Sequence, residues 1–177
     1  LYGGISGYLG GKVDIVMMRL AEAIMSIPSF YLLIILAGIL PANLTSTQRF
    51  IMITAILAFV SWASLSRIIR GMVLSIKTRE YVLASEVIGQ SKLNIIIKHI
   101  LPQTLTFTII AVSLSIPSYI LSESALSFIG LGIQQPDASW GNLLKDAQSY
   151  IVITSRPWLL ASGVLIFVTV LAYNILS

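Results

Sequence analysis

Long uncharged apolar stretches are the feature that most constrains the fold of this chain. A helix needs roughly 20 apolar residues to cross the hydrocarbon core of a membrane, with about 17 as the lower limit. Four stretches meet this requirement: 23–42 (interrupted by Pro28), 50–66, 100–122 and 157–177. Residues 1–11 look like the last turns of a fifth span. Because a helix satisfies its backbone hydrogen bonds within its own segment, we predict an all-α, polytopic transmembrane helical bundle forming a single domain over 1–177.

The composition excludes several other classes of protein. Charged residues make up 10% of the chain, whereas soluble domains carry about 25%. The net charge of +4 is therefore read as a membrane feature, and we expect the lipid bilayer, not nucleic acid, as a partner. The absence of cysteine excludes disulfides, thiolate metal sites and a cysteine nucleophile, and a single histidine leaves little scope for a metal site.

Basic residues divide unevenly between the two sides of the predicted membrane. If the spans alternate in direction, eight of the eleven Lys and Arg residues fall on one side. These eight are Lys12, Arg19, Arg67, Arg70, Lys77, Arg79, Lys92 and Lys98, whereas Arg49, Lys145 and Arg156 fall on the other. Cytoplasmic loops carry the excess of Lys and Arg, so we assign the first set to the cytoplasm. The polar segment 75–102 is then a cytoplasmic loop, and 123–156 is an outer loop.

The cytoplasmic loop has the pattern of two helices joined by a glycine elbow. Glu80–Ile88 can form a short helix, and Gly89 can end it because glycine accepts the left-handed conformation without steric penalty. Ser91 is a plausible N-cap for a second helix, and Pro102 fits the first turn of the following span. The apolar face expected for the second helix consists of Leu93, Ile96, Ile97 and Ile100.

The first of these helices also carries apolar side chains in rows. Leu83 with Val87, and Ala84 with Ile88, are spaced i, i+4 along one side. Such a helix can dock into a groove on another protein and transmit force to the membrane helices. The alternative is a solvated loop bent by ordinary capping, and the residues alone leave both interpretations open.

The span after this loop and the outer loop carry the remaining polar pattern. Ser113, Ser115, Ser118 and Ser122, with Glu123 at the outer end, are candidates to line a polar route, although hydroxyls in spans also make interhelical hydrogen bonds. In the outer loop, Trp140, Leu143, Leu144, Ala147 and Ile151 recur at helical spacing. They predict a short amphipathic helix anchored by Trp140.

Two stretches resemble motifs of nucleotide binding or catalysis, but the neighbouring residues do not support either function. Gly11-Lys12-Val13 lacks the Ser or Thr of a P-loop, so we expect no ATP site of that kind here. The tetrapeptide Gly4-Ile5-Ser6-Gly7 resembles the nucleophile turn of rhomboid-type intramembrane proteases, with His99 as a possible base. However, His99 lies at a predicted cytoplasmic boundary outside the spans. A stripe of Gly3, Gly7 and Gly11 that admits a neighbouring helix fits this stretch better.

The segment ending at Pro102 resembles the EAA loop of the inner-membrane permease subunits of binding-protein-dependent ABC importers. That pattern is E-A-A, three residues, G, nine residues, then I-x-L-P. Aligned on Gly89, the spacing to Leu101-Pro102 is kept, whereas Leu83, Ser85 and His99 depart from the pattern. These departures are similar to the oligopeptide, dipeptide and nickel branch of the family. Further stretches that resemble its C-type permease are 7–14, Met18-Arg19, 122–132, 139–142, Pro157-Trp158 and 171–174.

The resemblance implies a type I importer permease in a bacterial inner membrane. The helix before Gly89 would be its coupling helix, with coupling carried by Glu80, Tyr81, Ala84 and Gly89, and with Leu101 and Pro102 setting the angle into the span. The implied partners are a second homologous permease, two ATP-binding subunits and an extracytoplasmic substrate-binding protein. ATP and magnesium would bind those partner subunits, with no cofactor on this chain. The family also implies a further span before Leu1, a short tail after Ser177, and oligopeptides or dipeptides as substrates, with nickel left open.

Two other functions stay open at this point. A stand-alone channel or secondary carrier often places ionisable side chains within its spans, and 50–66, 100–122 and 157–177 contain none. An intramembrane serine protease would depend on Ser6. The pattern favours a transporter subunit driven from outside the membrane and without catalytic groups of its own.

Overall fold

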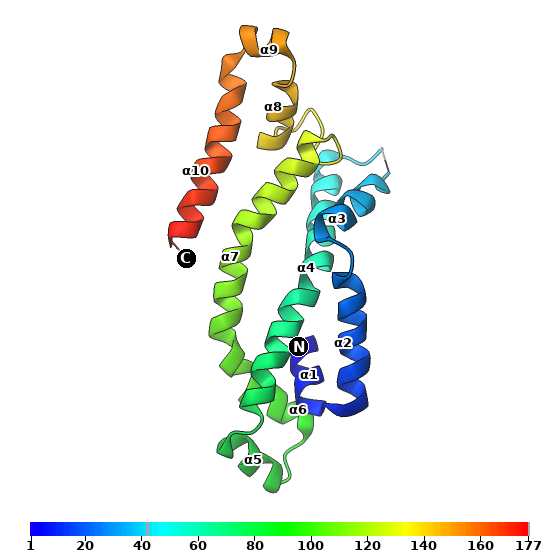
Figure 1. The fold of residues 1–177 in the computed structure, drawn as a ribbon, viewed down its shortest axis with the longest axis vertical. Helices are drawn as coiled ribbons and strands as arrows, with labels where there is room; N and C mark the ends of the chain where they lie inside the picture. Colours follow the sequence, from blue (N-terminus) through cyan, green and yellow to red (C-terminus); the bar gives the residue numbers. More distant parts are fainter. Residues whose placement is uncertain (42, 177) are drawn as a thin grey trace. The chain divides into compact units, whose positions relative to one another are not determined.

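The computed structural model describes residues 1–41 and 43–176, and every regular element in these ranges is a helix (Figure 1). The all-α prediction is confirmed. In chain order the elements are α1 (Tyr2–Leu9), α2 (Gly11–Met25), α3 (Ser29–Gly38), α4 (Ser46–Ile76), α5 (Glu80–Val87), α6 (Lys92–Ile95), the π-helical turn η1 (Ile96–Ile100), α7 (Leu101–Phe128), α8 (Trp140–Asp146), α9 (Tyr150–Ser155), the 3-10 turn η2 (Pro157–Leu160) and α10 (Ala161–Leu176).

Three helical segments of the described chain are long and apolar enough to cross a membrane. They are Ser46–Ile76, Lys92–Phe128 and Pro157–Ile175. The pair α2 and α3 would provide a fourth if it is one broken span. The predicted stretch 23–42 is therefore not one helix. Pro28 lacks a backbone N–H and disfavours helical geometry at the residue before it, so α2 ends at Met25 and α3 begins at Ser29. Ala42 and Ser177, the last residues of two predicted spans, lie outside the described residues.

Two predicted spans are longer in the structure than their uncharged stretches. Helix α4 continues ten residues beyond Ser66, because Arg67 and Arg70 are good helix formers, no proline follows them, and Gly71 lies within the helix without ending it. The span predicted at 100–122 begins at Lys92, through α6 and η1, and extends to Phe128. Pro102 is the second residue of α7, in the first turn as predicted. However, α7 continues directly from α6 and η1, so the helical segment as a whole begins ten residues before Pro102.

The chain divides into two compact units. Unit 1 consists of Leu1–Pro28 and Val60–Ala111, and unit 2 of Ser29–Phe59 with the described part of Val112–Ser177. Helices α4 and α7 contribute residues to both.

Unit 1 is built around an apolar core that joins its short helices to the end of α4. The core residues are Tyr8 from α1, Ile69, Val73 and Ile76 from α4, Val82 from α5, Ile95 from α6, and Ile96 and Ile100 from η1. The second helix of the loop thus buries Ile95, Ile96 and Ile100, whereas Leu93 and Ile97, predicted to share its apolar face, are exposed. The π-helical turn at Ile96–Ile100 shifts the helical register, which explains the departure from 3.6-residue spacing.

The N-terminal glycines let α1 approach α4 closely. A Cβ atom at Gly3 would overlap the carbonyl oxygen of Ser66, and one at Gly7 would lie 2.9 Å from the carbonyl oxygen of Arg70. Small residues permit this kind of helix contact. The prediction is confirmed for Gly3 and Gly7 but is wrong for Gly11. Gly11 begins α2 with φ of +54°, and a Cβ there would meet nothing within 4 Å.

In unit 2, α8 packs against α10, and its first turn is fixed by a capping box. Asn142 N–H donates to Ser139 Oγ at 3.2 Å, and Ser139 N–H donates to Asn142 Oδ1 at 2.9 Å. The helix predicted through Ile151 is two helices, α8 and α9. Ser149 has an extended backbone and starts α9 as its N-cap, a position that serine prefers to a helix interior. Ile151 is consequently 76% exposed and does not join the α8 face.

Candidate functional site

Helix α5 is short and defined at its C-terminal end by backbone hydrogen bonds. Gly89 has φ of +83°; its N–H donates to the Glu86 carbonyl at 2.9 Å, and the Gln90 N–H donates to the Ser85 carbonyl at 3.1 Å. These two bonds make a Schellman motif, which requires a left-handed residue at the position of Gly89. A Cβ at Gly89 would meet nothing within 4 Å, so glycine is needed there for its backbone alone. The predicted elbow is confirmed.

The two faces of α5 differ in burial. Val82 and Ser85 are buried, and Val82 belongs to the core of unit 1. On the other side Val87 is 88% and Ile88 78% exposed, with Leu83 also exposed. An apolar patch held on a buried base is a feature of protein interaction sites. We call Leu83, Val87 and Ile88 the α5 apolar patch.

Hydrogen bonds to α1 and to the α6–η1 segment hold α5 and its elbow. Tyr8 Oη, at the end of α1, donates to Glu86 Oε1 at 2.6 Å. After the elbow, Ser91 caps α6 by accepting from the Asn94 N–H, as predicted. The side-chain oxygen of Gln90 accepts from Asn94 Nδ2 and also lies 3.2 Å from His99 Nε2. The helix is therefore oriented by α1 and by α6 together.

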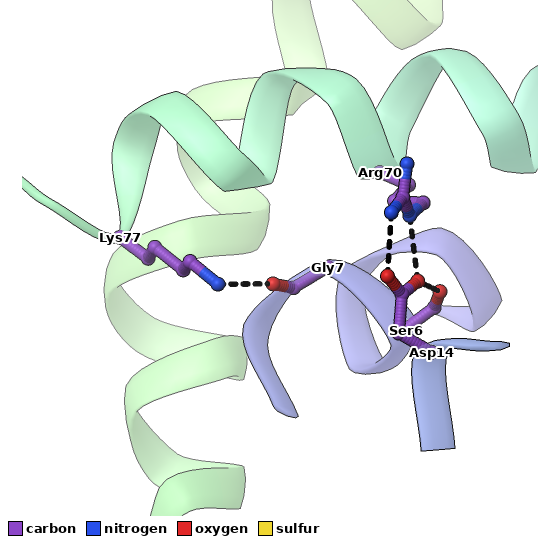
Figure 2. Close-up of polar contacts among 5 residues, drawn as sticks. All are labelled: Ser6, Gly7, Asp14, Arg70 and Lys77. Atoms are coloured by element: carbon purple, nitrogen blue, oxygen red, sulfur yellow. Dashed lines mark hydrogen bonds and ion pairs between the residues drawn. The ribbon is translucent and has the colours of Figure 1, made fainter. Parts of the chain in front are cut away.

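A polar cluster ties the end of α4 to the first two helices (Figure 2). Arg70 donates from Nε to Asp14 Oδ1 at 2.6 Å and from Nη2 to Asp14 Oδ2 at 2.5 Å. Ser6 Oγ donates to the same carboxylate, and Lys77 Nζ donates to the Gly7 carbonyl at 3.0 Å. Asp14 is only 8% exposed, so its charge depends on these protein partners, of which the bidentate pair with Arg70 supplies the opposite charge. We call Ser6, Asp14 and Arg70 the α1–α2–α4 staple.

The staple involves Ser6, the serine of the apparent protease motif. The hydroxyl of Ser6 is committed to Asp14, and His99 faces Gln90 in the elbow. A nucleophile and its base must lie within hydrogen-bond reach of each other. Ser6 and His99 are instead engaged with different partners.

The structure places four of the predicted coupling residues on one short segment. Glu80, Tyr81, Ala84 and Gly89 are all exposed on α5 or its elbow. Leu101 is half-buried, and a Cβ at Gly4 would lie 3.1 Å from its Cδ2 atom, so it packs on α1. Pro102 is exposed at the start of α7.

The predicted pathway residues all lie on α7 but do not share one face. Ser113 and Ser122 are about 180° apart around an ideal helix, at 100° per residue. Ser122 Oγ donates to the Ser118 carbonyl at 2.8 Å and Ser115 Oγ to the Val112 carbonyl at 2.7 Å, so these two hydroxyls bond within their own helix. Glu123 Oε1 accepts from Ser127 Oγ at 2.6 Å. Ser127 Oγ in turn accepts from the Ile133 N–H, which fixes the chain after α7.

Glu123 is also at a pocket of about 530 Å³ in unit 2. Its walls come from α4, α7 and the segment around Trp140, and most of them are apolar. Ser124 lines the same pocket, and its buried Oγ has no hydrogen-bond partner among the described residues.

Sequence reasoning missed the residues that hold these surfaces in place. Tyr8, Glu86 and the α1–α2–α4 staple act through contacts between distant segments. One signal was present in the sequence, because Asp14 is an acid in a largely apolar region and such an acid requires a basic partner. Arg49 was also missed. It is buried and donates to the Pro41 carbonyl at 3.2 Å and the Leu131 carbonyl at 3.5 Å.

The class of protein follows from the fold and from a family match. Residues 1–177 match the family described as binding-protein-dependent transport system inner membrane component. The chain belongs to this family, as its resemblance to the EAA-loop permeases predicted, and it is a multi-pass cell-membrane protein.

Within this family, the chain is similar to permeases of oligopeptide and dipeptide transport systems. The chain is 43% identical over 160 residues to the oligopeptide transport system permease protein OppC of Haemophilus influenzae, a match that covers 90% of this chain and 49% of that protein. It is 43% identical to OppC of Escherichia coli, over 95% of this chain and 53% of that protein. The dipeptide transport system permease protein DppC of Bacillus subtilis is 38% identical, over 100% of this chain and 53% of its own length. The chain thus spans about half the length of these relatives.

Proposed function

We propose that this chain is the membrane-spanning part of a permease subunit in an ATP-driven peptide importer. Its relatives are named as oligopeptide and dipeptide permeases, which supports peptides as the substrate class. In this proposal ATP and magnesium bind to two cytoplasmic ATPase subunits. A second permease completes the pathway, an extracytoplasmic binding protein delivers the substrate, and this chain contributes no catalytic group of its own.

The observation that carries this proposal is the α5 apolar patch on its anchored helix. Val87 and Ile88 are exposed on the loop that the sequence predicts to be cytoplasmic, whereas Val82 is buried in the core. A groove on an ATPase subunit would cover the patch. Because Val82 packs with Ile76 and Ile95 in one core, displacement of α5 would be transmitted to the ends of α4 and α7. Glu80, Tyr81, Ala84 and Gly89 would carry the coupling in this arrangement.

We extend the proposal to the pocket of unit 2. Its polar lining residues include Thr54, Tyr119, Glu123, Ser124 and Ser139. Glu123 is the carboxylate among them, and a carboxylate in a largely apolar pocket suits the ammonium group of a peptide. Ser113, Ser118 and Ser122 stay proposals for the pathway, with less support because their hydroxyls do not converge on this pocket.

The direct test is affinity purification of the full-length protein in mild detergent, with mass spectrometry of the proteins that accompany it. We expect two P-loop ATPase subunits and a second permease. A homomer without ATPase would contradict the proposal and would return a stand-alone carrier to consideration.

A variant pair makes this test specific to α5. Val87→Asp should abolish recovery of the ATPase, because an exposed apolar contact becomes a buried unpaired charge in the complex. Ile151→Asp introduces the same charge at another largely exposed apolar residue, in the predicted outer loop, and should leave ATPase recovery unchanged. Equal recovery with both variants would show that α5 is not the docking element.

A further inference from the structure

A small polar pocket lies between α2 and α4 in unit 1. The proposed peptide transport does not use it. It has a volume of about 220 Å³, and its polar lining includes three arginines, Arg19, Arg67 and Arg70. The two acids that line it are Asp14 and Glu22. The five charged side chains leave an excess of one positive charge, which a single phosphodiester would neutralise.

The three arginines of this pocket differ in the hydrogen bonds and ion pairs that they already make within the protein. Arg70 is held by Asp14 in the staple through Nε and Nη2. Arg19 has only an exposed i, i+3 pair with Glu22 at 3.2 Å, with 79% of its side chain exposed. Such a pair contributes little to stability, so Arg19 is available to another anion. Arg67 is exposed and has no hydrogen-bond or ion-pair partner among residues 1–41 and 43–176.

Apolar residues line the pocket together with the arginines. Ile15 and Met18 line the pocket itself, and Ile15 is largely exposed. Ile68 and Val16, which follow Arg67 and Ile15 in the chain, are exposed as well. A free phosphate would leave these apolar residues exposed to solvent, whereas the glycerol backbone and acyl chains of a phospholipid would cover them.

We propose that this pocket binds the phosphodiester headgroup of an anionic phospholipid, with Arg67 and Arg19 as its main ligands and Arg70 as a fixed positive charge behind them. The predicted cytoplasmic assignment of all three arginines agrees with this, since basic pockets between helices on that side suit anionic headgroups. The bound lipid would brace α2 against α4 beside the staple.

The test uses the full-length permease, purified in mild detergent with the subunits that accompany it. Short-chain phosphatidylglycerol is titrated into the sample, and binding is followed by native mass spectrometry. We expect Arg67→Gln and Arg19→Gln each to weaken binding about fivefold, the effect of one basic residue near an anionic lipid surface. Arg67 makes no contact that folding would lose, so its variant should keep the wild-type unfolding temperature.

Matched controls separate this site from general attraction to charge. Lys92→Gln and Lys98→Gln remove exposed basic residues of the same predicted side, outside the pocket, and should leave binding unchanged. Equal loss in all four variants, or equal binding of short-chain phosphatidylcholine, would overturn the proposal. Inorganic phosphate is the third arm: competition by phosphate at the same concentration as the lipid would show a free-anion site and would overturn the lipid assignment.

Discussion

Tyr8 and Glu86 are 78 residues apart in the sequence, yet the tyrosine hydroxyl donates a 2.6 Å hydrogen bond to the glutamate carboxylate. The bond joins the last turn of α1 to α5. Lys77, which donates to the Gly7 carbonyl, makes a second connection between the end of α1 and the end of α4 just before α5. The orientation of the candidate docking helix thus depends on the first ten residues of the chain.

Removal of the Tyr8 hydroxyl tests whether this bond positions α5. Tyr8→Phe keeps the ring in the core and loses a hydrogen bond worth about 1 kcal/mol. If that bond selects the coupling-competent orientation, peptide uptake by the reconstituted complex should fall roughly fivefold, the population ratio corresponding to this energy. Tyr150→Phe, at an exposed tyrosine of α9, should leave uptake unchanged. Wild-type uptake in Tyr8→Phe would show that the bond has no positioning role.

Asp14 should be far more important for stability than another acid of the same helix. Asp14→Asn leaves the guanidinium of Arg70 without its bidentate partner, and breaking such a pair costs about 3 kcal/mol when the site is buried. We expect a clear fall in the unfolding temperature in detergent, measured by tryptophan fluorescence. Glu22→Gln breaks only the exposed pair with Arg19 and should change stability by less than about 1 kcal/mol. Similar unfolding temperatures for the two variants would contradict the assigned role of the staple.

Close packing of α1 on α4 predicts a contrast between two glycines. Gly7→Ala would place a Cβ 2.9 Å from the Arg70 carbonyl oxygen and 3.0 Å from Val73 Cβ, so the helices must separate. Overpacking of this kind costs about 1–3 kcal/mol. Gly71→Ala, in α4, meets nothing within 4 Å and should stabilise the helix by up to about 1 kcal/mol. Thermal unfolding of both variants measures the contrast, and a stable Gly7→Ala variant would disprove the close contact.

The elbow at Gly89 should tolerate asparagine better than valine. Valine in the left-handed conformation is strained by about 1 kcal/mol or more, whereas asparagine adopts it more readily. We expect Gly89→Val to abolish transport without preventing membrane insertion and Gly89→Asn to keep most of it. Peptide uptake and the amount of protein in the membrane fraction are the two measurements. Normal uptake in Gly89→Val would refute the coupling role of the elbow.

Glu123 has two possible contributions that can be separated by substitution. Glu123→Ala removes the acceptor for Ser127 and loosens the segment that Ser127 holds through Ile133. Glu123→Gln keeps an acceptor oxygen and removes only the charge. If the carboxylate contacts the peptide ammonium, uptake should fall by a similar factor in both variants, while only Glu123→Ala lowers the unfolding temperature. Wild-type uptake in Glu123→Gln would limit this residue to a structural role.

The sequence by itself determined the local features of this protein. Apolar stretches specified helices that can cross a membrane, Pro28 specified a break, and Gly89 with Ser91 specified an elbow, because each depends on neighbouring residues alone. Helix ends were less predictable, as the extension of α4 through Arg70 shows. A charged side chain can continue a helix when a distant partner such as Asp14 compensates it.

Tertiary structure decided which polar residues meet. The bidentate pair of Asp14 with Arg70 joins residues 56 positions apart, and the bond from Tyr8 to Glu86 spans more. No local pattern encodes such contacts, since they depend on the packing of α1 on α4 through Gly3 and Gly7. The π-helical turn at Ile96–Ile100 likewise selected which isoleucines are buried, because the register of a helix against its neighbours is set by packing and not by its own periodicity alone.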